Sequence, residues 1–134
     1  MAKRERDRRG REDRGSASAE LVIATPLLLL LILGVIQFAL WQHATHVAEA
    51  AAQQGLAAGR VEGGTDATGR TETDAVLAQL GVLSDSRVAI NRTADMTTVT
   101  VTGEAPSVLP FVHLPVRAVA RGPSERFRSS GSNV

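Results

Sequence analysis

The chain has 134 residues, no cysteine, 3% aromatic residues and a formal net charge of +1. This length allows one modest domain and excludes a large core, and the lack of cysteine excludes disulfides and thiolate metal sites. The small net charge hides an asymmetry, because residues 1–15 hold seven basic and four acidic residues whereas residues 42–134 hold eight basic and nine acidic ones.

An uncharged apolar run, LVIATPLLLLLILGVIQFALW, covers residues 21–41. As a helix it would be about 31 Å long, which matches the hydrocarbon thickness of a bilayer, so we expect a transmembrane helix. The cations of the leader, residues 1–15, lie on its N-terminal side and predict a cytoplasmic N-terminus with an extracytoplasmic C-terminal part. Trp41 is predicted to anchor the far end at the membrane interface. Pro26 predicts a mild kink, because proline lacks a backbone N–H.

Glu20 borders this run, where an ionised carboxylate is costly and needs a reason. It follows Gly15, the last residue of the leader, by five positions. A charged leader that ends in Gly, an acid five residues later and an apolar helix with an early proline resemble the signal sequences of type IV pilins and pseudopilins. Within that group the stretch from Arg14 to Ala44 is similar to the TadE-like family of tight-adherence pilus systems.

The resemblance implies that a prepilin-type peptidase cuts between Gly15 and Ser16. It further implies that the new amine of Ser16 pairs in the membrane with Glu20 of a neighbouring subunit. Partners implied are the membrane, other pilin-like subunits, the peptidase, and an assembly platform with its ATPase. Glu20 has a second interpretation as a plain helix-start acid, favoured by the helix dipole and able to reach water.

The remaining chain predicts a pilin-like α+β architecture. One long helix is expected over 16–59, because strong helix formers continue beyond the apolar run. Small residues line one face of its outer half, namely Ala44, Ala48, Ala51, Gly55 and Ala58. Residues 60–70 predict a Gly-rich linker, and Thr71 predicts the cap of a short helix over 72–80.

Alternating apolar residues predict the strands of a small antiparallel sheet, which with the short helix forms a domain over 71–121. The expected strands are residues 87–91, 97–102 and 116–121. Residues 103–115 contain three prolines among apolar residues and predict either an irregular segment packed on the sheet or a patch facing a partner. Residues 122–134 predict a disordered tail by composition.

Chemistry-bearing motifs are lacking in the sequence, which predicts neither an enzyme nor a cofactor or metal site. His43, His46 and Glu49 share one helix edge, but this short pattern is typical of polar residues just outside a membrane. The acids among the leader's arginines favour a topology signal over nucleic-acid binding, and no small-molecule substrate is predicted.

The predicted function is a minor pilin-like structural or assembly component of a tight-adherence pilus or secretion system, which acts by helix association in the membrane. It either enters a surface fibre or assists its assembly. The alternative is a small binding domain without a pilus role, either secreted after a cut behind Ala50 or tethered without any cut.

Overall fold

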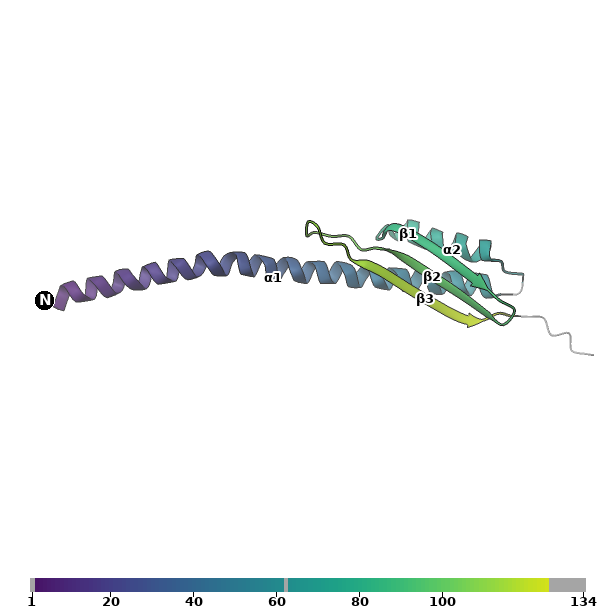
Figure 1. Ribbon diagram of the computed structural model, residues 1–134, viewed down its shortest axis with the longest axis horizontal. Helices are drawn as coiled ribbons and strands as arrows, with labels where there is room; N and C mark the ends of the chain where they lie inside the picture. Colours follow the sequence, from purple (N-terminus) through teal and green to yellow (C-terminus); the bar gives the residue numbers. More distant parts are fainter. Residues whose placement is uncertain (1, 62, 126–134) are drawn as a thin grey trace, which may run out of the picture. The chain divides into compact units, whose positions relative to one another are not determined.

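The computed structural model describes residues 2–61 and 63–125, with side chains described from residue 19 onward within those ranges. Its two helices are α1 (Ala2–Arg60) and α2 (Asp66–Leu80), shown in Figure 1. Three strands follow, β1 (Ser84–Arg92), β2 (Met96–Glu104) and β3 (Pro115–Pro123). The predicted α+β class, with a long helix, a short helix and an antiparallel sheet, is confirmed.

The chain divides into two compact units, one that ends at Ile36 and one that begins at Gln37. The described residues of the first unit belong to the N-terminal part of α1. This helix begins at Ala2 rather than at the predicted residue 16, so the leader is helical as well. Arginine, the most frequent residue of the leader, is a good helix former, which explains the earlier start. The helix continues through Pro26, whose predicted kink stays a prediction.

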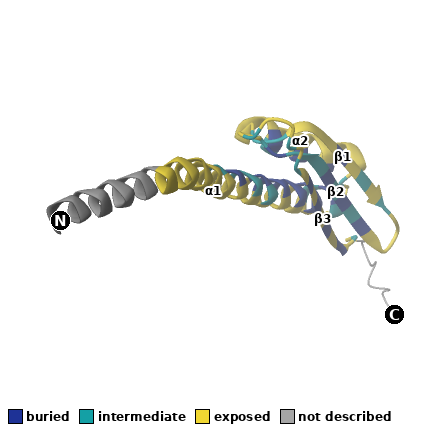
Figure 2. Ribbon diagram, turned by 60° about the vertical axis from the view of Figure 1, so that its left-hand side comes forward, coloured by how far each residue is buried: buried dark blue, intermediate teal, exposed yellow. Residues whose placement is uncertain are grey.

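The second unit has its core between the C-terminal part of α1 and one face of the sheet (Figure 2). Of the small residues predicted to share one face of α1, Ala44, Ala48 and Ala51 are fully buried and Gly55 is buried as well. The alternating inward residues of β2 and β3 complete this core, namely Thr97, Val99, Val101, Val116, Ala118 and Ala120. The helix therefore supplies apolar cover that so small a sheet lacks by itself.

The sheet is antiparallel in the order β1-β2-β3. In the central strand, Val101 pairs with Val88 of β1 and with Ala118 of β3. The turn after β1 is closed by Thr93, whose backbone N–H donates to the carbonyl oxygen of Met96 at 2.8 Å. All three strands extend beyond their predicted bounds at both ends. Backbone pairing continues past the alternating apolar residues, because the ladder uses main-chain groups alone.

The start of α2 corrects the prediction of a linker over residues 60–70 and a cap at Thr71. The helix begins at Asp66, and its N-cap is Thr65, in extended conformation. The Thr65 hydroxyl accepts a hydrogen bond from the backbone N–H of Thr68 at 3.1 Å, which satisfies one of the donors that a helix start leaves unpaired.

Gly69 misled the sequence prediction, because a glycine in a polar stretch indicates a linker. In the structure it lies buried inside α2, where an added Cβ would come within 2.9 Å of the carbonyl oxygen of Gly55 in α1 and of Cδ1 of Ile90 in β1. The glycine thus serves close packing of α2 on α1 and β1, and not chain flexibility. Next to it, the buried hydroxyl of Thr73 donates to the Gly69 carbonyl oxygen at 2.8 Å.

The C-terminal end of α1 is held by Arg92 of β1. Its guanidinium donates hydrogen bonds to the carbonyl oxygens of Gly59 and Gly64, and to that of Val61 at 3.3 Å. The last turn of a helix leaves carbonyl groups without intrahelical donors, and a cation is favoured at this end of the dipole. Arg92 therefore ties the end of α1 to the sheet.

The predicted tail over residues 122–134 is wrong at its start. Gly122 and Pro123 belong to β3, which pairs with β2 up to the partners Met96 and Pro123. Beyond the strand, the backbone N–H of Glu125 donates to the carbonyl oxygen of Arg60 at 2.9 Å. The ladder and this bond keep the start of the segment on the folded unit. Residues 126–134 lie outside the described residues.

Candidate functional site

The first unit carries a continuous run of exposed apolar side chains. Between Leu21 and Leu31 the large hydrophobic side chains are 56% to 74% exposed. Among the residues that the structure describes, one helix is long and apolar enough to cross a membrane, over Ala19–Arg60. Apolar surface of this extent is unfavourable in water, so the helix suggests membrane anchoring.

Glu20 lies at the start of this run and is exposed. Gly15 and Ser16 lie in the same helix, five and four positions earlier respectively, and their side chains are outside the described part of the chain. Helix positions four apart share one face, so Ser16 and Glu20 are one turn apart on the same side. The helix brings the predicted cleavage residues and the acid onto neighbouring turns; cleavage and pairing stay predictions.

Trp41, the predicted interface anchor, is partly buried at the edge of the second unit's core. Its indole N–H lies 3.3 Å from the carbonyl oxygen of Pro115, the first residue of β3. Its ring lies 6.1 Å from that of Phe38, at an interplanar angle of 43°. The polar end of the indole is thus paired within the protein, and the anchoring role stays a prediction.

Gln37 joins α1 to the segment between β2 and β3, a role that the sequence analysis missed. It is only 5% exposed, and its side-chain amide reaches the segment between β2 and β3. The Nε2 group donates to the carbonyl oxygen of Pro106 at 3.0 Å. The Oε1 atom accepts from the backbone N–H of Val108 at 2.8 Å and from the hydroxyl of Ser107 at 3.0 Å. A polar residue in an apolar run was the available signal, since a buried amide needs partners.

Residues 105–114, which connect β2 to β3, form a loop that we call loop 105–114. Figure 1 shows that it extends past the end of the sheet. Phe111 is 97% exposed and has a positive φ of 66°, and Val108 is 45% exposed. A left-handed conformation costs a residue with a side chain about 1–2 kcal/mol. The ends of the loop pack against the core through Ala105 and Leu114, and the predicted alternative of a patch facing a partner stays a prediction for its exposed residues.

The comparisons with known proteins concern the long helix. Residues 15–56 match the family model described as TadE-like protein. This segment is TadE-like. The predicted resemblance is thereby confirmed over less than half of the chain, and it suggests an association with tight-adherence pilus systems. No curated protein and no solved structure matches the chain.

The TadE-like segment contains every predicted site residue and Gln37 as well, because the match begins at Gly15 and extends past Trp41. The helix α2, the sheet and loop 105–114 lie outside it. The matched part of the chain therefore carries the apolar run and the helix side of the core.

Enzymatic chemistry finds no support in the TadE-like match, because that family is structural rather than catalytic. Within residues 19–61 and 63–125, no group of three or more metal-ligating side chains is placed to hold an ion. His46 and Glu49 form an exposed contact, with 3.7 Å between Nδ1 and Oε2. One exposed pair of this kind leaves too few ligands for zinc.

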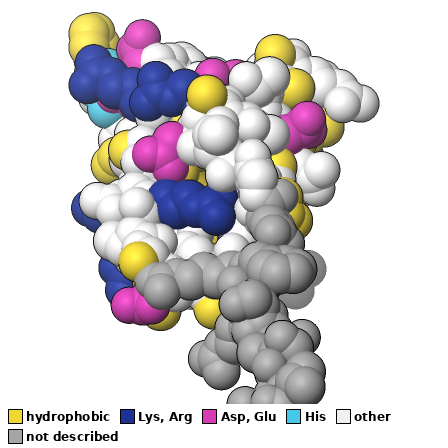
Figure 3. Space-filling view, turned by 90° about the vertical axis from the view of Figure 1, so that its right-hand side faces the viewer, with side chains coloured by type: hydrophobic (Ala, Val, Ile, Leu, Met, Phe, Trp, Pro, Cys, Tyr) yellow, Lys and Arg dark blue, Asp and Glu magenta, His cyan; other side chains and the backbone are white. Residues whose placement is uncertain are grey.

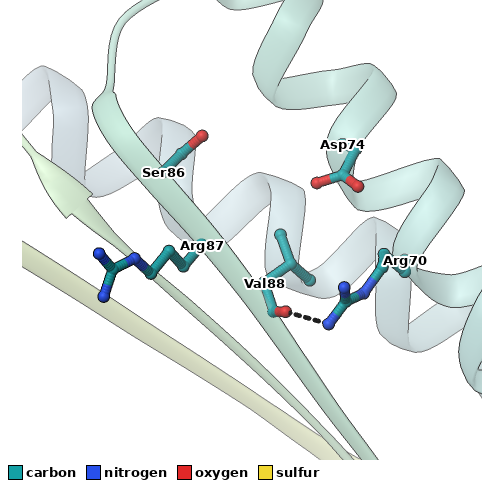
Figure 4. Close-up of a pocket in the computed structure, with 5 residues that line it drawn as sticks. All are labelled: Arg70, Asp74, Ser86, Arg87 and Val88. Atoms are coloured by element: carbon teal, nitrogen blue, oxygen red, sulfur yellow. Dashed lines mark hydrogen bonds between the residues drawn. The ribbon is translucent and has the colours of Figure 1, made fainter.

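A shallow pocket of about 430 Å³ lies between α2 and β1, lined by Arg70, Asp74, Ser86, Arg87 and Val88. The guanidinium of Arg70 donates a hydrogen bond to the carbonyl oxygen of Val88 at 2.7 Å. The side chain of Arg87 points away from this pair (Figure 4). The end of the second unit that faces the viewer in Figure 3 carries basic and acidic side chains interspersed with scattered hydrophobic ones. Neither surface gathers groups of one chemical kind, so neither favours a particular ligand.

Proposed function

We propose that the chain is a single-pass, pilin-like membrane component of a tight-adherence pilus system, with a structural role in assembly. Residues 21–41 of α1 cross the membrane with the N-terminus in the cytoplasm, and α2 and the sheet lie on the extracytoplasmic side. The basic leader supports this orientation, because cations are retained on the cytoplasmic side. Its partners are the membrane, other pilin-like subunits, a prepilin-type peptidase, and an assembly platform with its ATPase.

The observation that carries the proposal is where the family match begins. The TadE-like segment starts at Gly15, the residue before the proposed cut, and leaves residues 1–14, with all seven cations of the leader, outside. Cleavage between Gly15 and Ser16 would remove seven cations and create a free amine at Ser16. Gly15 suits a scissile position, because a residue without a side chain lets the backbone approach a catalytic site closely.

The new amine gives Glu20 a partner. A carboxylate next to the hydrocarbon is stabilised by a nearby cation, because pairing offsets part of the desolvation cost. The helix spacing keeps Ser16 and Glu20 on one face, one turn apart, so that helices packed along that face would bring the amine of one near the acid of the next. In this mechanism the cost of the unpaired acid favours association of subunits in the membrane.

The core argues against a secreted domain that is cut behind Ala50. Such a cut would remove Ala44, Val47 and Ala48, all buried in the core of the second unit. It would also remove Gln37, with its hydrogen bonds to the segment between β2 and β3, and Trp41, with its hydrogen bond to Pro115 of β3. The loss of buried apolar groups and of hydrogen-bond partners is destabilising, so this cut would weaken the domain that it releases.

The test is the N-terminal residue and the mass of the chain isolated from membranes of cells that hold the pilus system. We expect a start at Ser16 for the native chain and an uncut chain for the variant Gly15→Leu, whose side chain obstructs the approach of the peptidase. In the same cells the variant Glu20→Gln should be inserted and cut normally but lose crosslinks between copies. A start at Met1 or at Ala51 in the native chain would refute the proposal.

A further inference from the structure

We propose that loop 105–114 is a lipid-contacting element, with Phe111 and Val108 inserted at the boundary between headgroups and acyl chains next to α1. The inference rests on the membrane anchoring in the proposed function. It concerns a part of the chain that lies outside the TadE-like segment. Four sets of observations on the second unit carry it: depth, paired backbone groups, exposed apolar side chains and the position of charges.

The depth of the loop follows from its bonds to Gln37. An untilted helix needs about 20 residues to cross a hydrocarbon core of about 30 Å. Counted from Leu21, the first residue after Glu20, the outer boundary falls near Leu40. Gln37 precedes that boundary, and its amide is bonded to the backbone of Pro106 and Val108. The start of the loop therefore lies at the level of the outer hydrocarbon boundary.

Several backbone positions at the start and base of the loop do not depend on water. Unpaired N–H groups are costly in lipid. Pro106 and Pro110 have no N–H, and the N–H groups of Val108 and Leu109 donate to Oε1 of Gln37 at 2.8 and 3.4 Å. The N–H of Ala105, at the base of the loop, donates to the carbonyl oxygen of Leu114 at 2.9 Å. These groups do not depend on water for their partners.

The side chains at this level match a lipid partner. Phe111 is 97% exposed and Val108 45% exposed, whereas residues 105–112 include no charged residue. Phe38, on the helix one residue after Gln37, is 62% exposed as well. Exposed apolar and aromatic side chains near the outer end of a membrane span match the boundary between headgroups and acyl chains, where such rings are enriched.

The ionisable side chains lie at the base of the loop, next to the sheet. Glu104 ends β2, and its carboxylate lies 3.5 Å from Nδ1 of His113, which follows the apolar residues. Both side chains are exposed, so they remain available to water and headgroups. The loop thus has an apolar tip and a charged base. This arrangement is expected of a segment that enters the membrane interface from the aqueous side.

The experiment places one fluorescent probe at a time in the full-length chain, reconstituted in phosphatidylcholine vesicles. The chain has no cysteine, so each single-cysteine variant carries one environment-sensitive probe. Phe111→Cys and Val108→Cys report on the loop. Leu29→Cys reports on the middle of the span, and Met96→Cys is the matched control, because Met96 is an apolar residue with 46% exposure at the opposite end of the sheet.

Lipids with a quencher at a shallow or a deep acyl position supply the readout, and circular dichroism checks that each variant is folded. We expect deep quenching at position 29, shallow quenching at 111 and 108 that is several-fold stronger than at 96, and little quenching at 96.

Quenching at 29 with equal values at 111, 108 and 96 would overturn the inference and leave the membrane anchor intact. No quenching at 29 would refute the anchor and the inference together. Blue-shifted emission at 111 without lipid quenching would assign the loop to a protein partner and also overturn it.

Discussion

Gln37 is the only polar side chain between Thr25 and Trp41. Its amide is nearly fully buried, and both of its ends are used in hydrogen bonds to loop 105–114. A buried amide without partners would cost free energy, whereas one with partners fixes the groups that it binds. At this position the side chain joins a loop more than sixty residues away in sequence to α1.

Replacement of this side chain tests its role. Gln37→Ala leaves the N–H groups of Val108 and Leu109 without their acceptor, a loss that we expect to cost about 1–3 kcal/mol. The chain in detergent micelles should then show amide hydrogen exchange in loop 105–114 that is faster by tenfold or so, since each 1.4 kcal/mol corresponds to about one factor of ten. The control is Gln42→Ala, at an exposed helix position. Equal exchange in the two variants would contradict the assignment.

At the scale of elements, two glycines set how closely the helices pack. A Cβ at Gly55 of α1 would lie 1.9 Å from Oγ1 of Thr73 and 3.0 Å from the carbonyl oxygen of Gly69 in α2. The Thr73 hydroxyl is itself held by its bond to Gly69 and has no room to turn away freely. Gly59, one helical turn further, has its nearest atoms at 3.7 to 3.9 Å, which is ordinary contact.

These distances predict opposite outcomes for two alanine substitutions in the same helix. Gly55→Ala forces α2 away from α1 and should destabilise the folded unit by about 1–3 kcal/mol. In Gly59→Ala the added Cβ makes only ordinary van der Waals contacts, and the higher helix propensity of alanine should stabilise the unit by up to about 1 kcal/mol. Thermal unfolding followed by circular dichroism should therefore show a lower melting temperature for the first variant and an unchanged or higher one for the second. Similar melting of both variants would disprove the close packing at Gly55.

At the scale of the whole molecule, the burial of the side chains of α1 changes along its length. Up to Ile36 its large apolar side chains are mostly exposed, and from Ala44 onward its small residues are buried against the sheet. The folded unit therefore includes a stretch of helix before residue 51, and not only the chain that follows it. A folded unit that needs the helix before residue 51 is expected of a membrane component, whereas a domain released by a cut behind Ala50 would have to fold without that helix.

Two fragments test this dependence. A fragment of residues 37–134 keeps the buried part of α1 and should unfold cooperatively in urea. A fragment of residues 51–134 lacks Ala44, Val47 and Ala48 and should show no cooperative transition, because its remaining apolar burial is too small for a stable core. Unfolding is followed by circular dichroism. Equal midpoints for the two fragments would show that the earlier helix is dispensable and would revive the secreted alternative.

Local patterns in the sequence were sufficient for several elements. The apolar run, the small-residue face of α1 and the centres of all three strands were predicted, because each depends on a periodicity that is visible within a few residues. The Gly15 and Glu20 spacing led to the TadE-like family for the same reason, since the motif is continuous in the chain. The start of α2 was missed at residues 66–70, where a glycine that packs between helices looks like a linker.

The sequence by itself determined that the chain has one membrane-type helix, followed by an α+β unit, because length, charge and periodicity are local properties. Only the tertiary structure decided that Gln37 binds the segment between β2 and β3, that Arg92 holds the end of α1, and that Gly55 and Gly69 face each other. These contacts join residues that are far apart in the chain. Their partners depend on how α1, α2 and the sheet pack in space, which no local pattern encodes.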